Sequence, residues 1–205
     1  MVTGPKGAFE PLSFTLTAGE QLYRVFSNRS GRPANAFNPG AGRRTRFAFF
    51  GDPKVPVLYA AQTEEAAVCE TLLHDVPIDG GMLNHDDYGD KVMARLIAGR
   101  DLNLASFMGT GLRALKVEET DVTATPASSY GETVAWAEAA HAAGFDGIVW
   151  MSHRCNTDRA FVFFGDRVTD ADLEIDIRFA RVFELDPDRA WLSDFCAPLH
   201  VDVRW

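Results

Sequence analysis

The sequence has few cysteines and no paired pattern among them. Cys69, Cys155 and Cys196 form neither a CxxC pair nor a Cys/His group, and three is an odd number. A disulfide framework and a structural zinc site are therefore not indicated. A reducing compartment suits such a chain best.

Long apolar runs are also lacking. The first residues, MVTGPKGAFEPLSF, do not combine a charged start with an apolar run. No uninterrupted apolar stretch reaches the roughly 18 residues that a membrane-spanning helix needs. We therefore expect a cytoplasmic protein without a membrane partner.

Positive charge is scarce as well. The 205 residues include 20 Lys and Arg against 29 Asp and Glu, which gives a formal net charge of −9 without a basic stripe. Such a chain repels a nucleic-acid backbone, so we expect no direct nucleic-acid partner.

Arg43, Arg44 and Arg46 nevertheless cluster in "GRRTR" beside the Gly-rich "NPGAG". Arginine forks bind phosphate oxygens, so this loop suits a multiply charged anion, although a loop kept soluble by arginines gives the same pattern.

Several catalytic motifs are absent. The sequence contains no GxxxxGK[ST], strand-coupled GxGxxG, HExxH or GxSxG, so phosphate loops, zinc proteases and serine hydrolases are not supported. A bound dinucleotide would have to be held at its pyrophosphate by arginines. Ser152 and His153 are neighbours at the end of a predicted strand, where they point to opposite faces and cannot act together as nucleophile and base.

The composition is that of one packed domain. The chain is 46% hydrophobic, and its length suits a single unit of roughly 100–200 residues, which we place at 1–205. Period-two patterns and short apolar runs predict strands at 20–27, 57–61, 91–98, 102–107, 146–152, 160–165, 172–185 and 199–205. Two substantial helices are expected, one capped by Thr63 and one within 128–145. This order is not a regular βαβ alternation, so it indicates an α+β fold.

Glu70 is a carboxylate that its own helix does not explain. The residues one turn before it are alanines, and no Lys or Arg occurs between Lys54 and Lys91. A buried Glu70 would need positive charge from far along the chain, with Arg24 and the arginine cluster as the natural suppliers. A solvated glutamate at the edge of an apolar face is the alternative.

Four separated segments resemble one known family. "LYRV", "GRRTRF", "LYAAQTEEAAVCETLLH" and "GIVWMS" followed by "AFVFFGDRV" occur in the order found in RES domains, which are named for their Arg, Glu and Ser. The resemblance covers Tyr23 to Val168. It implies a fold similar to ADP-ribosyltransferases of the diphtheria-toxin type, with a core of two packed, mostly antiparallel sheets and flanking helices. RES domains are toxins of bacterial toxin-antitoxin pairs and consume NAD+.

The resemblance also implies site residues. It assigns the family's residues, in order, to Arg24, Arg46, Tyr59, Glu70 and Ser152. Arg43 and Arg44 compete with Arg46 in register, and Arg154 is a further candidate. Arg24, Glu70 and Ser152 are the implied catalytic residues. Arg24 and Arg46 would clamp the pyrophosphate of NAD+, Tyr59 would pack on the nicotinamide or its ribose, and Ser152 would hydrogen-bond the nicotinamide end.

The implied chemistry is cleavage of the nicotinamide-ribosyl bond by phosphorolysis or hydrolysis. Glu70 would stabilise the positive charge that develops on the ribose, and neither a cofactor nor a metal is expected because NAD+ is the substrate. Mono-ADP-ribosyl transfer to a protein is an alternative activity, and a catalytically silent binding module is a second alternative.

The family implies a helix-turn-helix antitoxin that blocks the cleft. The oligomeric state is open, a homo-oligomer included, and residues 169–205 lie outside the resemblance.

Overall fold

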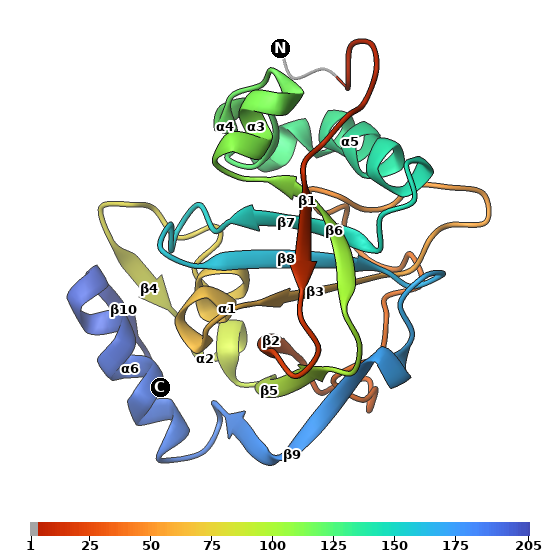
Figure 1. The fold of residues 1–205 in the computed structure, drawn as a ribbon. Helices are drawn as coiled ribbons and strands as arrows, with labels where there is room; N and C mark the ends of the chain where they lie inside the picture. The colour runs from red at the N-terminus through yellow and green to blue at the C-terminus, as the bar shows by residue number, and fades with distance from the viewer. Residues whose placement is uncertain (1–3) are drawn as a thin grey trace.

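The computed structural model describes residues 4–205 and has the α+β organisation that the sequence predicted (Figure 1). The strands are β1 (Ser13–Leu16), β2 (Gln21–Ser27), β3 (Val57–Ala61), β4 (Gly81–Leu83), β5 (Lys91–Ala98), β6 (Leu102–Phe107), β7 (Gly147–Met151), β8 (Arg159–Phe164), β9 (Leu173–Val182) and β10 (Val201–Val203). The α-helices are α1 (Glu64–Thr71), α2 (His85–Tyr88), α3 (Thr110–Leu115), α4 (Glu119–Val122), α5 (Tyr130–Ala142) and α6 (Asp188–Cys196).

Eight strands form one curled sheet in the order β1-β6-β7-β8-β3-β2-β5-β9. All neighbours in this sheet are antiparallel except β6 and β7, which are parallel. A second, small sheet joins β10 to β4 in parallel. The C-terminal residues therefore extend both sheets, with β9 at an edge of the large sheet and β10 in the small one.

The predicted elements within the resemblance are present with small shifts at their ends. The strands expected at 57–61, 91–98 and 102–107 are β3, β5 and β6, and the two expected helices are α1 and α5. The sequence did not predict the strands β1 and β4 or the helices α2, α3, α4 and α6. In α6 only Leu192 and Cys196 are buried, and Pro187 at its N-cap provides no side-chain hydrogen bond, so neither a long apolar stripe nor a cap marks this helix.

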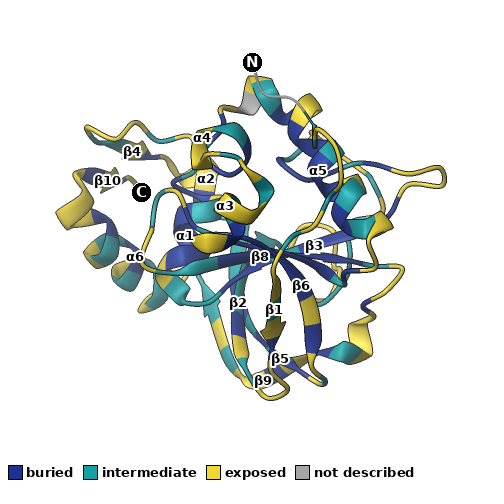
Figure 2. Ribbon diagram, turned by 45° about the horizontal axis from the view of Figure 1, so that its top comes forward, coloured by how far each residue is buried: buried dark blue, intermediate teal, exposed yellow. Residues whose placement is uncertain are grey.

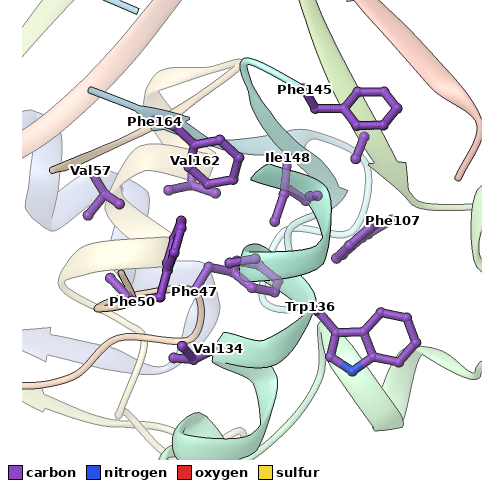
Figure 3. Packing of buried hydrophobic residues seen from close by; sticks show 14 of the residues in the cluster. Phe47, Phe50, Val57, Phe107, Val134, Trp136, Phe145, Ile148, Val162 and Phe164 are labelled. Atoms are coloured by element: carbon purple, nitrogen blue, oxygen red, sulfur yellow. The ribbon is translucent and has the colours of Figure 1, made fainter. Parts of the chain in front are cut away.

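The core beneath α5 is rich in aromatic rings (Figure 3). Trp136 of α5 meets Phe107 of β6 edge to face, with ring centroids 6.0 Å apart. Phe47, from the segment before β3, packs edge to face on Trp150 of β7 at 5.2 Å. Strands β3, β7 and β8 are almost wholly buried. Figure 2 shows the dark colour of β3 and β8. This rigid centre carries the segments that form the candidate site.

The topology brings distant parts of the sequence to one place. Helix α1 follows β3 directly and packs against β2, β3 and β8. Only β8 separates β3 from β7, so the end of β7 also lies close to α1. In the described range 4–205, no helix is long and apolar enough to cross a membrane.

Candidate functional site

A cavity of about 420 Å³ lies between β2, β3, α1 and the long segment 28–56. Its volume falls within the roughly 300–1,000 Å³ of small-molecule sites. The lining includes six of the residues that the sequence singled out: Arg24, Arg43, Arg44, Arg46, Tyr59 and Glu70. Segments that are far apart in sequence thus converge on one hollow.

Glu70 reaches the cavity from the last turn of α1. Thr63 begins this helix, since its hydroxyl accepts a hydrogen bond of 3.2 Å from Ala66 N. Ala66, Ala67, Val68 and Cys69 of α1 are buried, whereas Glu70 is half-buried at the cavity. The small Ala67 also lines the hollow, so the helix leaves space beside the carboxylate.

Ser152 forms a hydrogen bond with the carboxylate of Glu70. It directly follows β7 and is 0% exposed, and its Oγ donates a hydrogen bond of 2.7 Å to Glu70 Oε1. Cys155 N donates to the same Oγ at 3.2 Å, and Ser152 N donates to Asp158 O at 2.9 Å. Because a carboxylate can only accept, the serine proton is directed at Glu70, and the serine oxygen accepts from Cys155 N. In this structure Ser152 orients Glu70.

Arg24 is half-buried in β2 and fastens the long segment over the cavity. Its Nη1 donates to Ala34 O at 2.6 Å and to Ala36 O at 2.9 Å. Burial lowers the pKa of Arg24 to about 10, so the guanidinium remains charged at neutral pH. The residue therefore combines a structural attachment with a positive charge at the cavity wall.

Tyr59 is tied to the arginine cluster by its hydroxyl. Phe47 N donates to the phenol oxygen at 3.1 Å, and the phenol lies 2.9 Å from Thr45 Oγ1. Burial raises the pKa of Tyr59 to about 12. Its ring meets Trp150 edge to face with centroids 6.1 Å apart. Tyr59 thus fixes the chain on both sides of Arg46.

The three clustered arginines differ in environment. Arg43 and Arg44 are exposed, whereas Arg46 is 7% exposed. Arg46 Nη2 donates to Thr125 O at 3.3 Å, and its guanidinium lies over the Tyr130 ring at 5.4 Å. Its Nε is buried without a hydrogen-bond partner among the described residues. A buried donor without a partner is costly, so this atom indicates a missing acceptor.

A second cavity of about 380 Å³ adjoins the first. The two share Arg46, Glu70, His74 and Asp75 in their walls. The second also takes in Ala124, Thr125, Pro126, His153 and Arg154. Arg154, a candidate from the sequence, therefore lies in this neighbouring hollow. The buried hydroxyl of Thr125 has no partner within residues 4–205.

The structure adds residues that the sequence did not assign to the site. Trp150 is 1% exposed and belongs to the core, yet it borders the first cavity, and its Nε1 has no partner in the described chain. Tyr130 and His74 also line that cavity, 2.6 Å apart between Oη and Nε2. A tryptophan in an apolar strand gives no sequence signal that separates a cavity wall from ordinary core.

Comparisons with known proteins bear on the family and on the fold. The RES domain model matches residues 21–188, which extends beyond Val168 through β9. The search of curated proteins gave no match. Among solved structures, a chain of the M. tuberculosis MbcT-MbcA toxin-antitoxin complex has a TM-score of 0.60 and 15% identity, covering 89% of this chain and 92% of that one. This likeness supports the fold. Because the family model spans most of the sequence, the chain belongs to the RES-domain family, as its spaced motifs predicted.

Proposed function

We propose that the protein binds NAD+ in the first cavity and breaks the bond between nicotinamide and ribose, as a toxin-type enzyme. Membership in the RES-domain family supports the substrate class, because the family resemblance implies consumption of NAD+. The observation that carries the proposal is the carboxylate of Glu70, fixed by Ser152 in a cavity that is otherwise rich in arginine. This distribution matches a substrate with an anionic pyrophosphate that becomes cationic at the ribose as it reacts.

Glu70 supplies the negative charge that this reaction needs. Loss of nicotinamide gives the ribose oxocarbenium character, and a carboxylate held in place stabilises that charge more in the transition state than in the ground state. The hydrogen bond from Ser152 holds the carboxylate in one position before the reaction, which reduces the reorganisation during the chemical step.

Arginines bind the other end of the substrate in this proposal. Arg24, Arg44 and Arg46 line the cavity, and Arg46 keeps a buried Nε available for an oxygen of the pyrophosphate. Trp150 Nε1 is a second buried donor at the same wall and suits a carbonyl or hydroxyl of the ligand. Bound NAD+ would therefore provide partners for groups that the protein itself leaves unpaired.

The bond is broken in this proposal by attack of an acceptor on the ribosyl carbon, with nicotinamide as the leaving group. Water or phosphate gives degradation, and a protein side chain gives mono-ADP-ribosyl transfer. The second cavity favours keeping transfer as the alternative, because Glu70 also lines it and it offers a further approach for an acceptor. A helix-turn-helix antitoxin over the cavity mouth is the proposed partner, in line with the toxin-antitoxin complex among the similar structures.

Incubation with NAD+ labelled in the adenosine part tests the function. We expect release of nicotinamide, measured by chromatography, together with labelled ADP-ribose or its phosphate. Label retained on an added protein mixture instead indicates transfer. If NAD+ raises the melting temperature but stays intact for hours, the protein is a binding module and the proposed activity is wrong.

A further inference from the structure

Tyr130, His74 and Asp75 form a hydrogen-bonded chain beside Glu70. The phenol oxygen of Tyr130 lies 2.6 Å from His74 Nε2, and His74 Nδ1 lies 2.8 Å from Asp75 Oδ1. Tyr130 lines the first cavity, whereas His74 and Asp75 line both cavities. His74 lies in the turn after α1, four residues beyond Glu70, and both residues line the two cavities, so the chain begins at the place where a ribosyl acceptor would approach.

The chemistry of the three groups sets the direction of the protons. A carboxylate only accepts, so Asp75 directs the proton of neutral His74 to Nδ1. Nε2 is then an acceptor, and Tyr130 donates its hydroxyl proton to it. Burial raises the pKa of Tyr130, so this phenol carries its proton at neutral pH. The lone pairs of its oxygen remain available to a donor in the cavity.

We propose that this chain removes the proton of the acceptor in the reaction suggested above, and that the acceptor is a neutral hydroxyl, either water or an alcohol. The inference rests on the proposed function. As the acceptor oxygen bonds to the ribosyl carbon, the electrons of the carbon-nitrogen bond leave with nicotinamide. The acceptor gives its proton to Tyr130, and Tyr130 passes its own proton to His74.

The surroundings suit this proton transfer. Arg46 lies over the Tyr130 ring at 5.4 Å, where its charge favours developing negative charge on the phenol. Asp75 stabilises the imidazolium, and its side chain is 88% exposed against 30% for His74, so the proton has a route to solvent. The other charged or titratable groups that line the cavities next to His74 are Glu70 from α1, Arg43 and Arg44 from the arginine-rich segment, Tyr23 and Arg24 from β2, Tyr59 from β3, and His153 and Arg154 after β7.

The residues have separate roles in this relay. Tyr130 contacts the acceptor and is the catalytic member, whereas His74 and Asp75 act through it as positioning and proton-accepting residues. General-base assistance contributes roughly 10²- to 10⁴-fold to a rate, so losing it gives a measurable change in kcat. Binding of NAD+ does not depend on this proton, so KM should change little.

The test measures the steady-state kinetics of nicotinamide release with Tyr130→Phe and His74→Gln. We expect kcat to fall about 100-fold in each variant, with KM for NAD+ within about threefold of the wild type. His141→Gln is the matched control, because His141 also bonds a carboxylate, Asp166 at 2.7 Å, but lies outside both cavities.

Chemical rescue separates proton transfer from structural damage. Azide is a nucleophile with no proton to lose, so it should restore nicotinamide release in both variants and give the ribosyl azide. Equal melting shifts with ADP-ribose should show that the variants remain folded. The relay is wrong if kcat is unchanged in the variants, or if azide fails to rescue a variant that is folded. In either case, turnover by the wild type still supports the proposed function. Absence of nicotinamide release from the wild type with water, phosphate, azide and protein acceptors overturns both.

Discussion

Ser152 Oγ donates a hydrogen bond of 2.7 Å to Glu70 Oε1, joining residues that are 82 positions apart. The bond connects the end of β7 to the last turn of α1, two elements that meet only because β3 and β7 both flank β8. The serine has a second partner in Cys155 N, which donates to its oxygen and holds the hydroxyl in place. Glu70 is therefore oriented by a neutral hydroxyl, while arginines line the same cavity and remain available to an anion.

Ser152→Ala removes this orientation without changing the charge of the site. We expect kcat for nicotinamide release to fall about tenfold with little change in KM, because one carboxylate hydrogen bond is worth roughly 1.5 kcal/mol. Steady-state kinetics check this, with Ser193→Ala in α6 as the control. A rise in KM at constant kcat would contradict an orienting role and favour direct contact with substrate.

Arg46 and Arg43 should differ in their effect on substrate binding. Arg46→Met removes a buried guanidinium with an unpaired Nε, and we expect KM for NAD+ to rise about 10- to 100-fold. Arg43→Met removes an exposed charge, so its effect should stay within about threefold. Equal effects from the two substitutions would show that the pyrophosphate is bound by general positive charge and not by Arg46.

Arg24 should control the order of the segment that covers the cavity. Arg24→Met removes the bonds to Ala34 O and Ala36 O, so amide hydrogens in residues 28–56 should exchange faster than in the wild type. Hydrogen exchange read by mass spectrometry measures this directly. Exchange that stays unchanged there would mean that other contacts hold the segment.

Tyr59 should contribute to the free energy of unfolding, and this contribution should be lost in alkali. Its pKa is raised to about 12 in the folded protein, against about 10 in an unfolded chain. The folded state holds the proton more tightly, so the contribution is complete below pH 10 and disappears as the pH rises from about 10 through about 12. Urea unfolding at several pH values should show that the free energy of unfolding falls less steeply in alkali for Tyr59→Phe than for the wild type. An identical loss in both proteins would rule out Tyr59 as a source.

The fold was predictable where the sequence pattern was strong. Strand β3 is a compact run of apolar residues, and the Thr63 cap with two following glutamates marks the start of α1. Strand β4 has only three residues, and α6 has only two buried residues, so the local sequence pattern could not identify either element. Both depend on packing between the C-terminal residues and the chain after α1, because β10 pairs with β4.

The site was predictable only in part. Motif spacing identified the residues that the cavity gathers around Glu70, since family segments preserve their order along the chain. The sequence could not show that Ser152 bonds Glu70, that Arg24 is attached to the covering segment, or that Trp150 presents an unpaired donor. These relationships come from tertiary contacts between segments that are dozens of residues apart.

The most direct measurement compares nicotinamide release by the wild type, Glu70→Gln and Glu65→Gln. Glu65 lies on the first turn of the same helix and is exposed, so it controls for loss of a carboxylate from α1. We expect Glu70→Gln to bind NAD+ with similar affinity by calorimetry and to lose about 100- to 1,000-fold in kcat, while Glu65→Gln retains full activity. Undiminished turnover in Glu70→Gln would contradict the central claim that this carboxylate stabilises the charge on the ribose.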